Sequence, residues 1–144
     1  MLVQPYLFFD GRCEEALAFY GKTVGAQVLF QMRYKDMPPD PNNPVNMELS
    51  DKIMHTSFRI GDTELMASDG QCDGKQAAHC GYSLSLTADD LESAQKMFNA
   101  LADGGKVTMP FAPTFWSKGF GMVADRFGVG WMVTVPHEGE MPQS

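Results

Sequence analysis

The order of the predicted elements repeats once along the chain, and this repeat constrains the fold more than any other feature. Self-similarity at a fixed period indicates a structural unit that is built twice. At an offset of 78 residues the matching positions are Phe8 with Leu86, Glu14 with Glu92, Ala16 with Ala94, Tyr20 with Phe98 and, after one inserted residue, Val28 with Val107. We therefore expect two modules, 1–72 and 78–135, followed by a polar tail at 136–144.

The first half predicts one helix among four strands. The helix is indicated by one apolar face at the i, i+3, i+4, i+7 spacing, which consists of Cys13, Ala16, Leu17 and Tyr20. Gly25 marks its end, and the prolines within 36–44 exclude regular structure there. Runs of β-forming residues predict the strands 5–9, 28–34, 55–60 and 64–68, the last two joined at Gly61.

The second half predicts the same order of elements. Asp89 and Glu92 have the spacing of a capping box at the start of a helix, and Gly104 stops it. The apolar stripe of this helix consists of Leu91, Ala94, Phe98 and Leu101. The predicted strands are 82–87, 107–109, 121–124 and 131–135. Both halves are therefore βαβββ modules, and we expect an α+β fold.

Charge and composition exclude several classes of partner. The chain has 11 basic and 18 acidic residues, a net charge of -7, and no basic patch of the kind that nucleic-acid binding requires. No run approaches the about 18 apolar residues of a membrane span, and the first residues lack the positive segment of a secretory signal. Cys13, Cys72 and Cys80 form no CxxC pair, which is typical of reduced thiols. We expect a cytoplasmic protein that contacts neither nucleic acid nor membrane.

Segments in both halves resemble a known group of proteins. They are 5–11 (Pro-Tyr-Leu-Phe-Phe-Asp-Gly), 13–16 and 19–20 in the first half, and 114–116, 119–121 and 125–132 in the second. They are similar to the PhnB-like branch of the glyoxalase/bleomycin-resistance proteins, within the vicinal oxygen chelate superfamily. The resemblance covers nearly the whole chain and implies that each module forms one wall of a cupped mixed sheet.

Members of this branch often carry a demethylubiquinone methyltransferase label. Methyl transfer requires a donor site, usually a glycine-rich loop that follows a strand and opens a helix. The glycines at 119, 121, 128 and 130 are instead expected among strands and turns. The sequence therefore does not favour methyl transfer.

The superfamily resemblance also implies a divalent metal held by His, Glu or Gln from the first and last strands of each module. The corresponding positions here are Gln4, Met66, Ser83 and Met132. Thioethers and hydroxyls do not suit the harder divalent ions, which prefer imidazole and carboxylate. We therefore expect no cofactor and no obligatory metal.

A metal-dependent lyase, isomerase or dioxygenase is the main alternative. It would need a set of ligands other than the four aligned positions, such as Gln4 or His79 together with Glu64, or a contribution from His55. Cys80 follows His79 directly, but neighbouring strand residues point to opposite faces and do not form a nucleophile pair. Without a metal, acid and base chemistry would fall on Asp69, Asp125 or His55, which nothing in the sequence pairs.

Methionine and aromatic residues predict a ligand cup, if the assumed alternation of the strands holds. Methionine adapts to irregular ligands, although the same residues also serve as ordinary core. The predicted lining is Tyr6, Phe8, Met32, Phe58, Met66, Trp116, Phe120 and Met132. The leading hypothesis is a small-molecule-binding protein of the glyoxalase/bleomycin-resistance type. A non-enzymatic structural homodimer is a further alternative, and a homodimer is expected in either case because such modules leave open sheet edges.

Residues 114–121 combine aromatic side chains with glycines and predict a loop or bent hairpin. Aromatic residues on loops often anchor a partner, because loops carry function disproportionately. We expect this segment to be a flap over the mouth of the cup. A subunit contact or a structural corner is the alternative.

Overall fold

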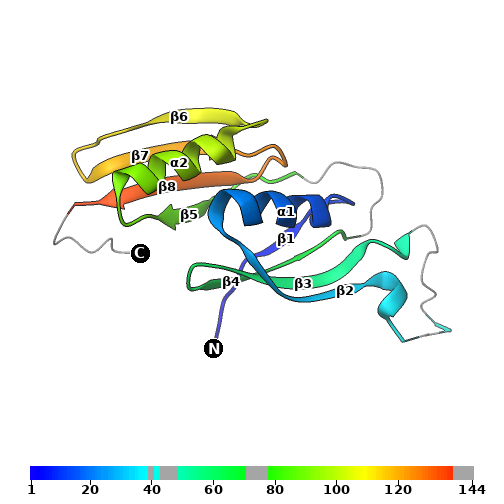
Figure 1. Cartoon of the computed structure of the whole chain (residues 1–144). Coiled ribbons are helices and arrows are strands. Elements are labelled where there is room, and N and C mark those ends of the chain that lie inside the picture. The colour runs from blue at the N-terminus through cyan, green and yellow to red at the C-terminus, as the bar shows by residue number, and fades with distance from the viewer. Residues whose placement is uncertain (39–40, 43–48, 71–77, 138–144) are drawn as a thin grey trace. The chain divides into compact units, whose positions relative to one another are not determined.

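Both halves of the chain fold in the βαβββ order that the repeat predicts (Figure 1). The computed structural model describes residues 1–38, 41–42, 49–70 and 78–137. Contacts divide the chain into two units, Met1–Ala77 and Ala78–Ser144. Cys72, part of the proline-rich segment and nearly all of the predicted polar tail lie outside the described residues.

The described residues of each unit form four strands and one α-helix. The first unit consists of β1 (Tyr6–Phe8), α1 (Cys13–Val24), β2 (Gln27–Arg33), the short 3-10 helix η1 (Tyr34–Asp36), β3 (Ile53–Ile60) and β4 (Thr63–Ser68). The second consists of β5 (Leu84–Thr87), α2 (Leu91–Ala102), β6 (Lys106–Ala112), β7 (Ser117–Ala124) and β8 (Gly130–Pro136). The main difference from the sequence prediction is β7, which begins four residues earlier and takes in much of the expected flap.

The two sheets have the same topology. The strand order is β1-β4-β3-β2 in the first and β5-β8-β7-β6 in the second. The outer pairs β1–β4 and β5–β8 are parallel, and the other neighbouring strands are antiparallel. This confirms the predicted α+β fold of tandem modules.

Helix α1 forms where its periodicity predicts it, and Cys13, Ala16, Leu17 and Tyr20 are all buried. Gly25 ends the helix in the left-handed conformation, at φ 72°. No side chain caps the helix from its own N-terminus, but buried Asp69 does so from the end of β4. One carboxylate oxygen accepts a hydrogen bond from the Cys13 amide at 2.8 Å, and the other accepts from the Ile53 amide at 2.7 Å. Asp69 thereby joins the start of α1 to the start of β3.

Helix α2 begins one residue later than the predicted capping box. The cap is Asp90, whose carboxylate accepts a hydrogen bond from the Ser93 amide at 2.7 Å. The buried stripe contains Ala94, Phe98 and Leu101, whereas Leu91 is exposed. The capping box at Asp89 and the inclusion of Leu91 in the stripe were therefore wrong.

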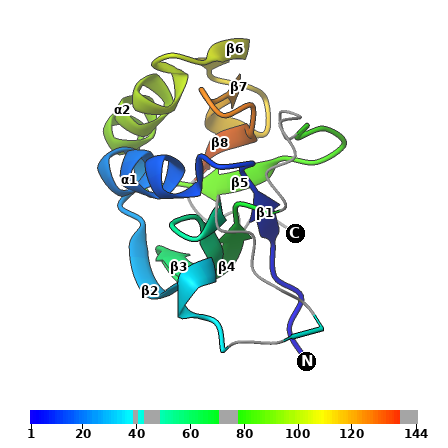
Figure 2. The same ribbon diagram turned by 90° about the vertical axis from the view of Figure 1, so that its right-hand side faces the viewer.

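Each sheet has one buried face and one open face. In the first unit the buried face includes Leu7, opposite Ala67 on β4, and α1 packs on β3 (Figure 2). In the second unit Leu86 lies opposite buried Val133 on the face that α2 covers. Phe8 lies on the open face of its sheet, so the structural counterpart of Leu86 is Leu7. The predicted Phe8–Leu86 match was therefore wrong by one residue. A shift of one residue along a strand moves a side chain to the opposite face of the sheet.

Two glycines of β7 allow Phe98 of α2 and Phe111 of the neighbouring strand β6 to pack closely against β7. A Cβ atom at Gly121 would lie 2.7 Å from Cε2 of Phe98, and one at Gly119 would lie 2.5 Å from Cζ of Phe111. Both positions of β7 therefore require glycine, because a side chain there would collide with Phe111 or Phe98. Among the described residues, no helix has the length and apolar composition needed to cross a membrane.

Candidate ligand-binding site

The register of the first sheet brings together side chains from all four strands on its open face. Tyr6 on β1 lies opposite Met66 on β4, Met66 lies opposite Ser57 on β3, and Ser57 lies opposite Phe30 on β2. Met32 and His55 form the neighbouring pair on β2 and β3. Tyr6, Phe8 and Phe30 are exposed, while Met32, His55 and Met66 are half-buried. We call these six residues the Tyr6–His55 face.

A hydrogen bond between Tyr6 and His55 lies at the centre of this face. The phenolic oxygen is 3.0 Å from Nδ1 of the imidazole. Aromatic rings surround the pair: the ring centroid of Phe8 lies 5.1 Å from that of Tyr6, and the centroid of Phe30 lies 6.1 Å from that of His55. The face therefore combines exposed apolar area with one positioned polar pair.

Partial burial raises the pKa of Tyr6 above its ordinary value. The phenol therefore stays protonated near neutral pH and can donate its hydrogen to Nδ1 of His55. A neutral imidazole that accepts at Nδ1 carries its own proton at Nε2. The pair can in this way present a hydrogen-bond donor to a molecule on the open face.

The second unit carries a separate group of apolar side chains on its open face. Met132 lies opposite Ser85 on one side and Met122 on the other, and Phe120 lies opposite Thr134. The ring of Trp116 lies 5.5 Å from that of Phe120. Phe115, at 4.9 Å from Trp116, is almost fully exposed in the connection between β6 and β7.

The structure assigns the eight predicted lining residues to three places. Tyr6, Phe8, Met32 and Met66 lie together on the open face of the first sheet, and Trp116, Phe120 and Met132 belong to the group in the second unit. Phe58 lies opposite Leu65 on the other face of the first sheet and is fully buried, so it is core. Sequence reasoning missed Phe30, although its place two residues before Met32 on the same strand indicates that both side chains project from one face. It also missed His55 as a partner of Tyr6, because their proximity depends on the strand register.

The donor atoms of the open faces do not fit a divalent metal of the superfamily type. Met66 and Met132 offer thioethers, and His55 supplies the one imidazole of the Tyr6–His55 face. The side-chain amide of Gln4 donates a hydrogen bond to the Glu64 carbonyl at 3.3 Å. Within the described ranges, no three His, Cys, Asp or Glu side chains gather closely enough to hold a metal ion.

The two other candidates for acid and base chemistry, Asp125 and Asp69, accept hydrogen bonds from backbone amides of the fold. Asp125 is buried between β7 and β8, where it accepts hydrogen bonds from the Phe127 and Val129 amides at 2.8 and 3.1 Å. It also accepts one from the indole of Trp131 at 2.9 Å. Asp69 holds two backbone amides in a similar way. His79 lies near Tyr82, with 2.6 Å between Nδ1 and the phenolic oxygen.

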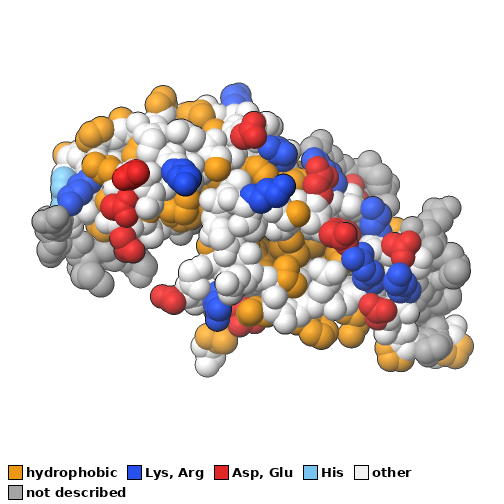
Figure 3. Space-filling model, viewed as in Figure 1, with side chains coloured by type: hydrophobic (Ala, Val, Ile, Leu, Met, Phe, Trp, Pro, Cys, Tyr) orange, Lys and Arg blue, Asp and Glu red, His pale blue; other side chains and the backbone are white. Residues whose placement is uncertain are grey.

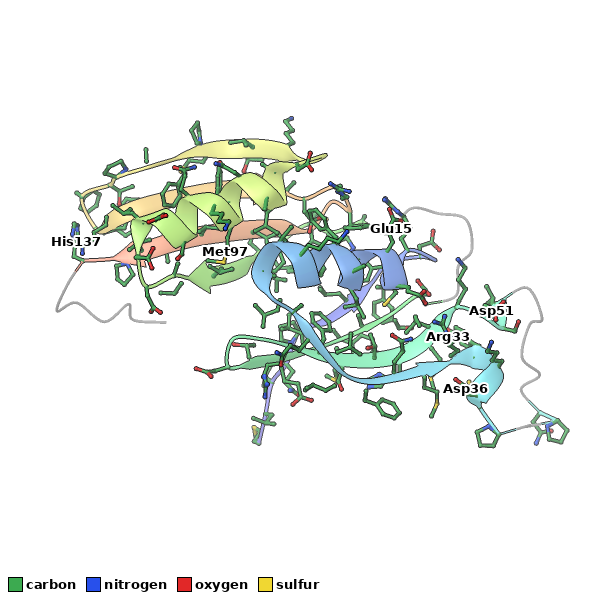
Figure 4. All side chains as sticks on the ribbon, in the orientation of Figure 1. Glu15, Arg33, Asp36, Asp51, Met97 and His137 are labelled. Carbon is green, nitrogen blue, oxygen red and sulfur yellow. The ribbon has the colours of Figure 1, made fainter. Side chains whose placement is uncertain are left out.

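A cavity of about 520 Å³ lies elsewhere in the first unit and is mostly charged. Its lining includes Glu14 and Glu15 of α1, Arg33 of β2 and Asp51 before β3. Figure 4 labels Glu15, Arg33 and Asp51, and Figure 3 shows charged side chains on the surface around them. Arg33 pairs with Glu14, which raises the pKa of its guanidinium. Lys35 lies 2.9 Å from Asp51 and lowers the pKa of that carboxyl. These charges largely compensate one another.

A family model described as 3-demethylubiquinone-9 3-methyltransferase matches residues 2–134. The chain belongs to this PhnB-like family. It is 38% identical over 141 residues to the protein YjdN of Escherichia coli, with 94% of this chain and 95% of that protein covered. It also resembles the crystal structure of PA1353 from Pseudomonas aeruginosa, at 40% identity and a TM-score of 0.82, with 94% of this chain and 98% of that chain covered.

The solved PhnB protein of Bacillus cereus is 27% identical, with a TM-score of 0.75 and coverage of 94% of this chain and 99% of that one. The fosfomycin resistance protein FosX of Listeria monocytogenes shares the fold at 10% identity and a TM-score of 0.62, with 96% of this chain and 94% of that chain covered. The PhnB-like family thus has the fold of the glyoxalase/bleomycin-resistance proteins.

Proposed function

We propose that this protein binds a small aromatic or amphipathic molecule on the Tyr6–His55 face and requires no catalytic metal to do so. The observation that carries the proposal is the 3.0 Å contact between Tyr6 and His55 within a set of exposed rings and methionines. Exposed aromatic residues contribute a large contact area to a bound molecule. The polar pair would orient one oxygen or nitrogen atom of that molecule.

The chemistry of the face supports an adaptable site. Two methionines, Met32 and Met66, can adjust their side chains to an irregular apolar surface. Small-molecule sites are typically apolar with a few placed polar groups, and this face has that composition. We therefore expect ligands with one aromatic ring and one hydrogen-bonding substituent, such as phenols or aromatic carboxylic acids.

The methyltransferase description of the family is not supported by the glycines of this chain. Gly119 and Gly121 lie inside β7, where they accommodate Phe111 and Phe98, and Gly130 opens β8. A backbone cradle for a methyl donor normally lies between a strand and the start of a helix. Gly119 and Gly121 serve packing within the second unit instead.

A thermal-shift screen of phenols, aromatic carboxylic acids and aromatic amines tests the proposal. A compound at 100 times its dissociation constant adds about 2.7 kcal/mol to the free energy of unfolding. We expect hits with the wild-type protein and a lost shift for Phe8→Ala, whereas Leu91→Ala, an exposed apolar change on α2, keeps it. No hit in any class, or an undiminished shift with Phe8→Ala, would contradict the proposal.

A further inference from the structure

The open face of the first sheet ends in a row of charged and polar side chains. Arg59 on β3 lies opposite Glu64 on β4 and opposite Gln27 on β2. Residues directly opposite each other in an antiparallel pair project from the same face. Glu64 lies two residues before Met66, and side chains two residues apart on a strand share a face, so the row belongs to the open face. We call Gln27, Arg59 and Glu64 the charged row.

The two charges of this row are available to a bound molecule. Arg59 and Glu64 are both exposed. The guanidinium of Arg59 turns toward β2, where Nη2 donates a hydrogen bond to Oε1 of Gln27 at 3.0 Å. Neither Arg59 nor Glu64 forms an ion pair with another described residue, although the register places them opposite each other. A cation and an anion therefore stand side by side on this face.

This pair of charges favours a zwitterion over a ligand with a net charge. The carboxylate of a simple aromatic acid beside Arg59 would also lie near Glu64, in the field of a chain with a net charge of -7. The ammonium group of a simple amine beside Glu64 would also lie near Arg59. In an α-amino acid the nitrogen and the carboxylate carbon are about 2.5 Å apart, from the bond lengths around the α-carbon. Such a group can therefore contact side chains on two neighbouring strands at once.

The distance from the charged row to the aromatic part of the face matches a short ligand. Met66 and Tyr6, which lie opposite each other, form the next row. Two residues along a strand span about 6–7 Å, and an aromatic ring one methylene away from an α-carbon covers this distance. The ring would contact Tyr6 and Met66, as aromatic and thioether groups favour. A polar substituent at the far end of the ring would point toward the pair formed by Tyr6 and His55.

We propose that this face selects aromatic α-amino acids, with Arg59 donating hydrogen bonds to the carboxylate and Glu64 accepting them from the ammonium group. The planar guanidinium presents its donors in a geometry that suits a carboxylate. The inference rests on the proposed function, because it requires that an aromatic ring bind on the Tyr6–His55 face. It adds the class of ligand and the two residues that select it.

An NMR titration with four related phenols tests the class of ligand. They are tyrosine, tyramine, which lacks the carboxylate, para-hydroxyphenylpropanoate, which lacks the ammonium group, and para-ethylphenol, which lacks both. We expect tyrosine to bind about 3- to 10-fold more tightly than tyramine or the propanoate, because it makes both charged contacts. Binding of para-ethylphenol without a gain for tyrosine would overturn the inference and leave the proposed function standing. No binding by any of the four compounds would overturn the inference as well, and the wider screen then decides the proposed function alone.

The variants Arg59→Gln and Glu64→Gln assign the two charges. Each should weaken tyrosine binding about 3- to 10-fold and keep the wild-type affinity for para-ethylphenol, which shows that the fold and the ring site are intact. Lys22→Gln, in the last turn of α1, is the control for a lost cation, and Asp62→Asn, in the exposed turn between β3 and β4, is the control for a lost anion. Both controls should bind tyrosine like the wild-type protein. Wild-type tyrosine affinity in Arg59→Gln or Glu64→Gln, or an equal loss in the controls, would overturn the inference.

Discussion

The phenolic oxygen of Tyr6 lies 3.0 Å from Nδ1 of His55, although the two residues are 49 positions apart and belong to strands separated by β4. The contact requires that β1 run parallel to β4 and that both side chains project from the open face. It therefore links the topology of the βαβββ unit to the chemistry of its surface. The proposed function depends on this relationship.

Asp69→Asn should lower the free energy of unfolding by about 2–4 kcal/mol. The side-chain nitrogen of asparagine would replace one of the two carboxylate oxygens, and it cannot accept the hydrogen bond that the Cys13 or the Ile53 amide donates to that oxygen. Urea denaturation measures the change. Asp62→Asn, in the exposed turn between β3 and β4, is the matched control and should change little. Equal stability of the two variants would mean that Asp69 does not join α1 to the sheet.

Gly121→Ala and Gly21→Ala should change stability in opposite directions. A methyl group at Gly121 would collide with Phe98 and the backbone of Phe111, so we expect a loss of about 1–3 kcal/mol. At Gly21 in α1 the new methyl group makes an ordinary contact of 3.5 Å, and the higher helix propensity of alanine should add about 0.5–1 kcal/mol. Thermal unfolding of the two variants decides both signs.

Cys13 and Cys80 should differ strongly in reactivity. Burial raises the pKa of the Cys13 thiol, and the neighbouring carboxylates of Asp69 and Glu14 raise it further, so the reactive thiolate does not form near neutral pH. Cys80 is exposed. Iodoacetamide should label Cys80 in the native protein and Cys13 only after unfolding, as mass spectrometry of the peptides can show. Native labelling of Cys13 would be inconsistent with its burial at the start of α1.

The purified protein should carry no stoichiometric divalent metal. Beside thioethers and hydroxyls, the open face of the first sheet offers one imidazole, at His55, and one carboxylate, at Glu64, and these compensate poorly for the lost hydration of such an ion. Elemental analysis of protein prepared without chelator, with zinc, nickel, manganese and iron assayed, measures the content. About one equivalent per chain that is lost in His55→Ala would contradict the prediction.

The helices were predictable from the sequence because their periodicity is local. All four buried residues of α1 lie at the expected positions, and Gly25 ends the helix as predicted. Strand faces were less predictable, because a shift of one residue exchanges them. The short strand β1 offers three residues of pattern, and the repeat alignment placed Phe8 on the face that Leu7 occupies.

The candidate site was predictable only in part for the same reason. Alternation correctly placed Tyr6 and Phe8 on one face, but it did not reveal that Phe58 points to the other. The partner of Tyr6 is set by the pairing of β1 with β4 and of β4 with β3, and these long-range registers leave no local signal. His55 therefore stood out in the sequence only as a candidate metal ligand or acid–base group, and not as the partner of Tyr6.

The central claim is tested most directly by calorimetric titration of Tyr6→Phe and Tyr82→Phe with a compound found in the screen. Each variant removes one phenolic oxygen that contacts a histidine Nδ1, Tyr6 in the first unit and Tyr82 in the second. Loss of the oriented donor should weaken binding roughly 3- to 10-fold in Tyr6→Phe, while Tyr82→Phe binds like the wild-type protein. Unchanged affinity in Tyr6→Phe, or equal loss in both variants, would contradict the account.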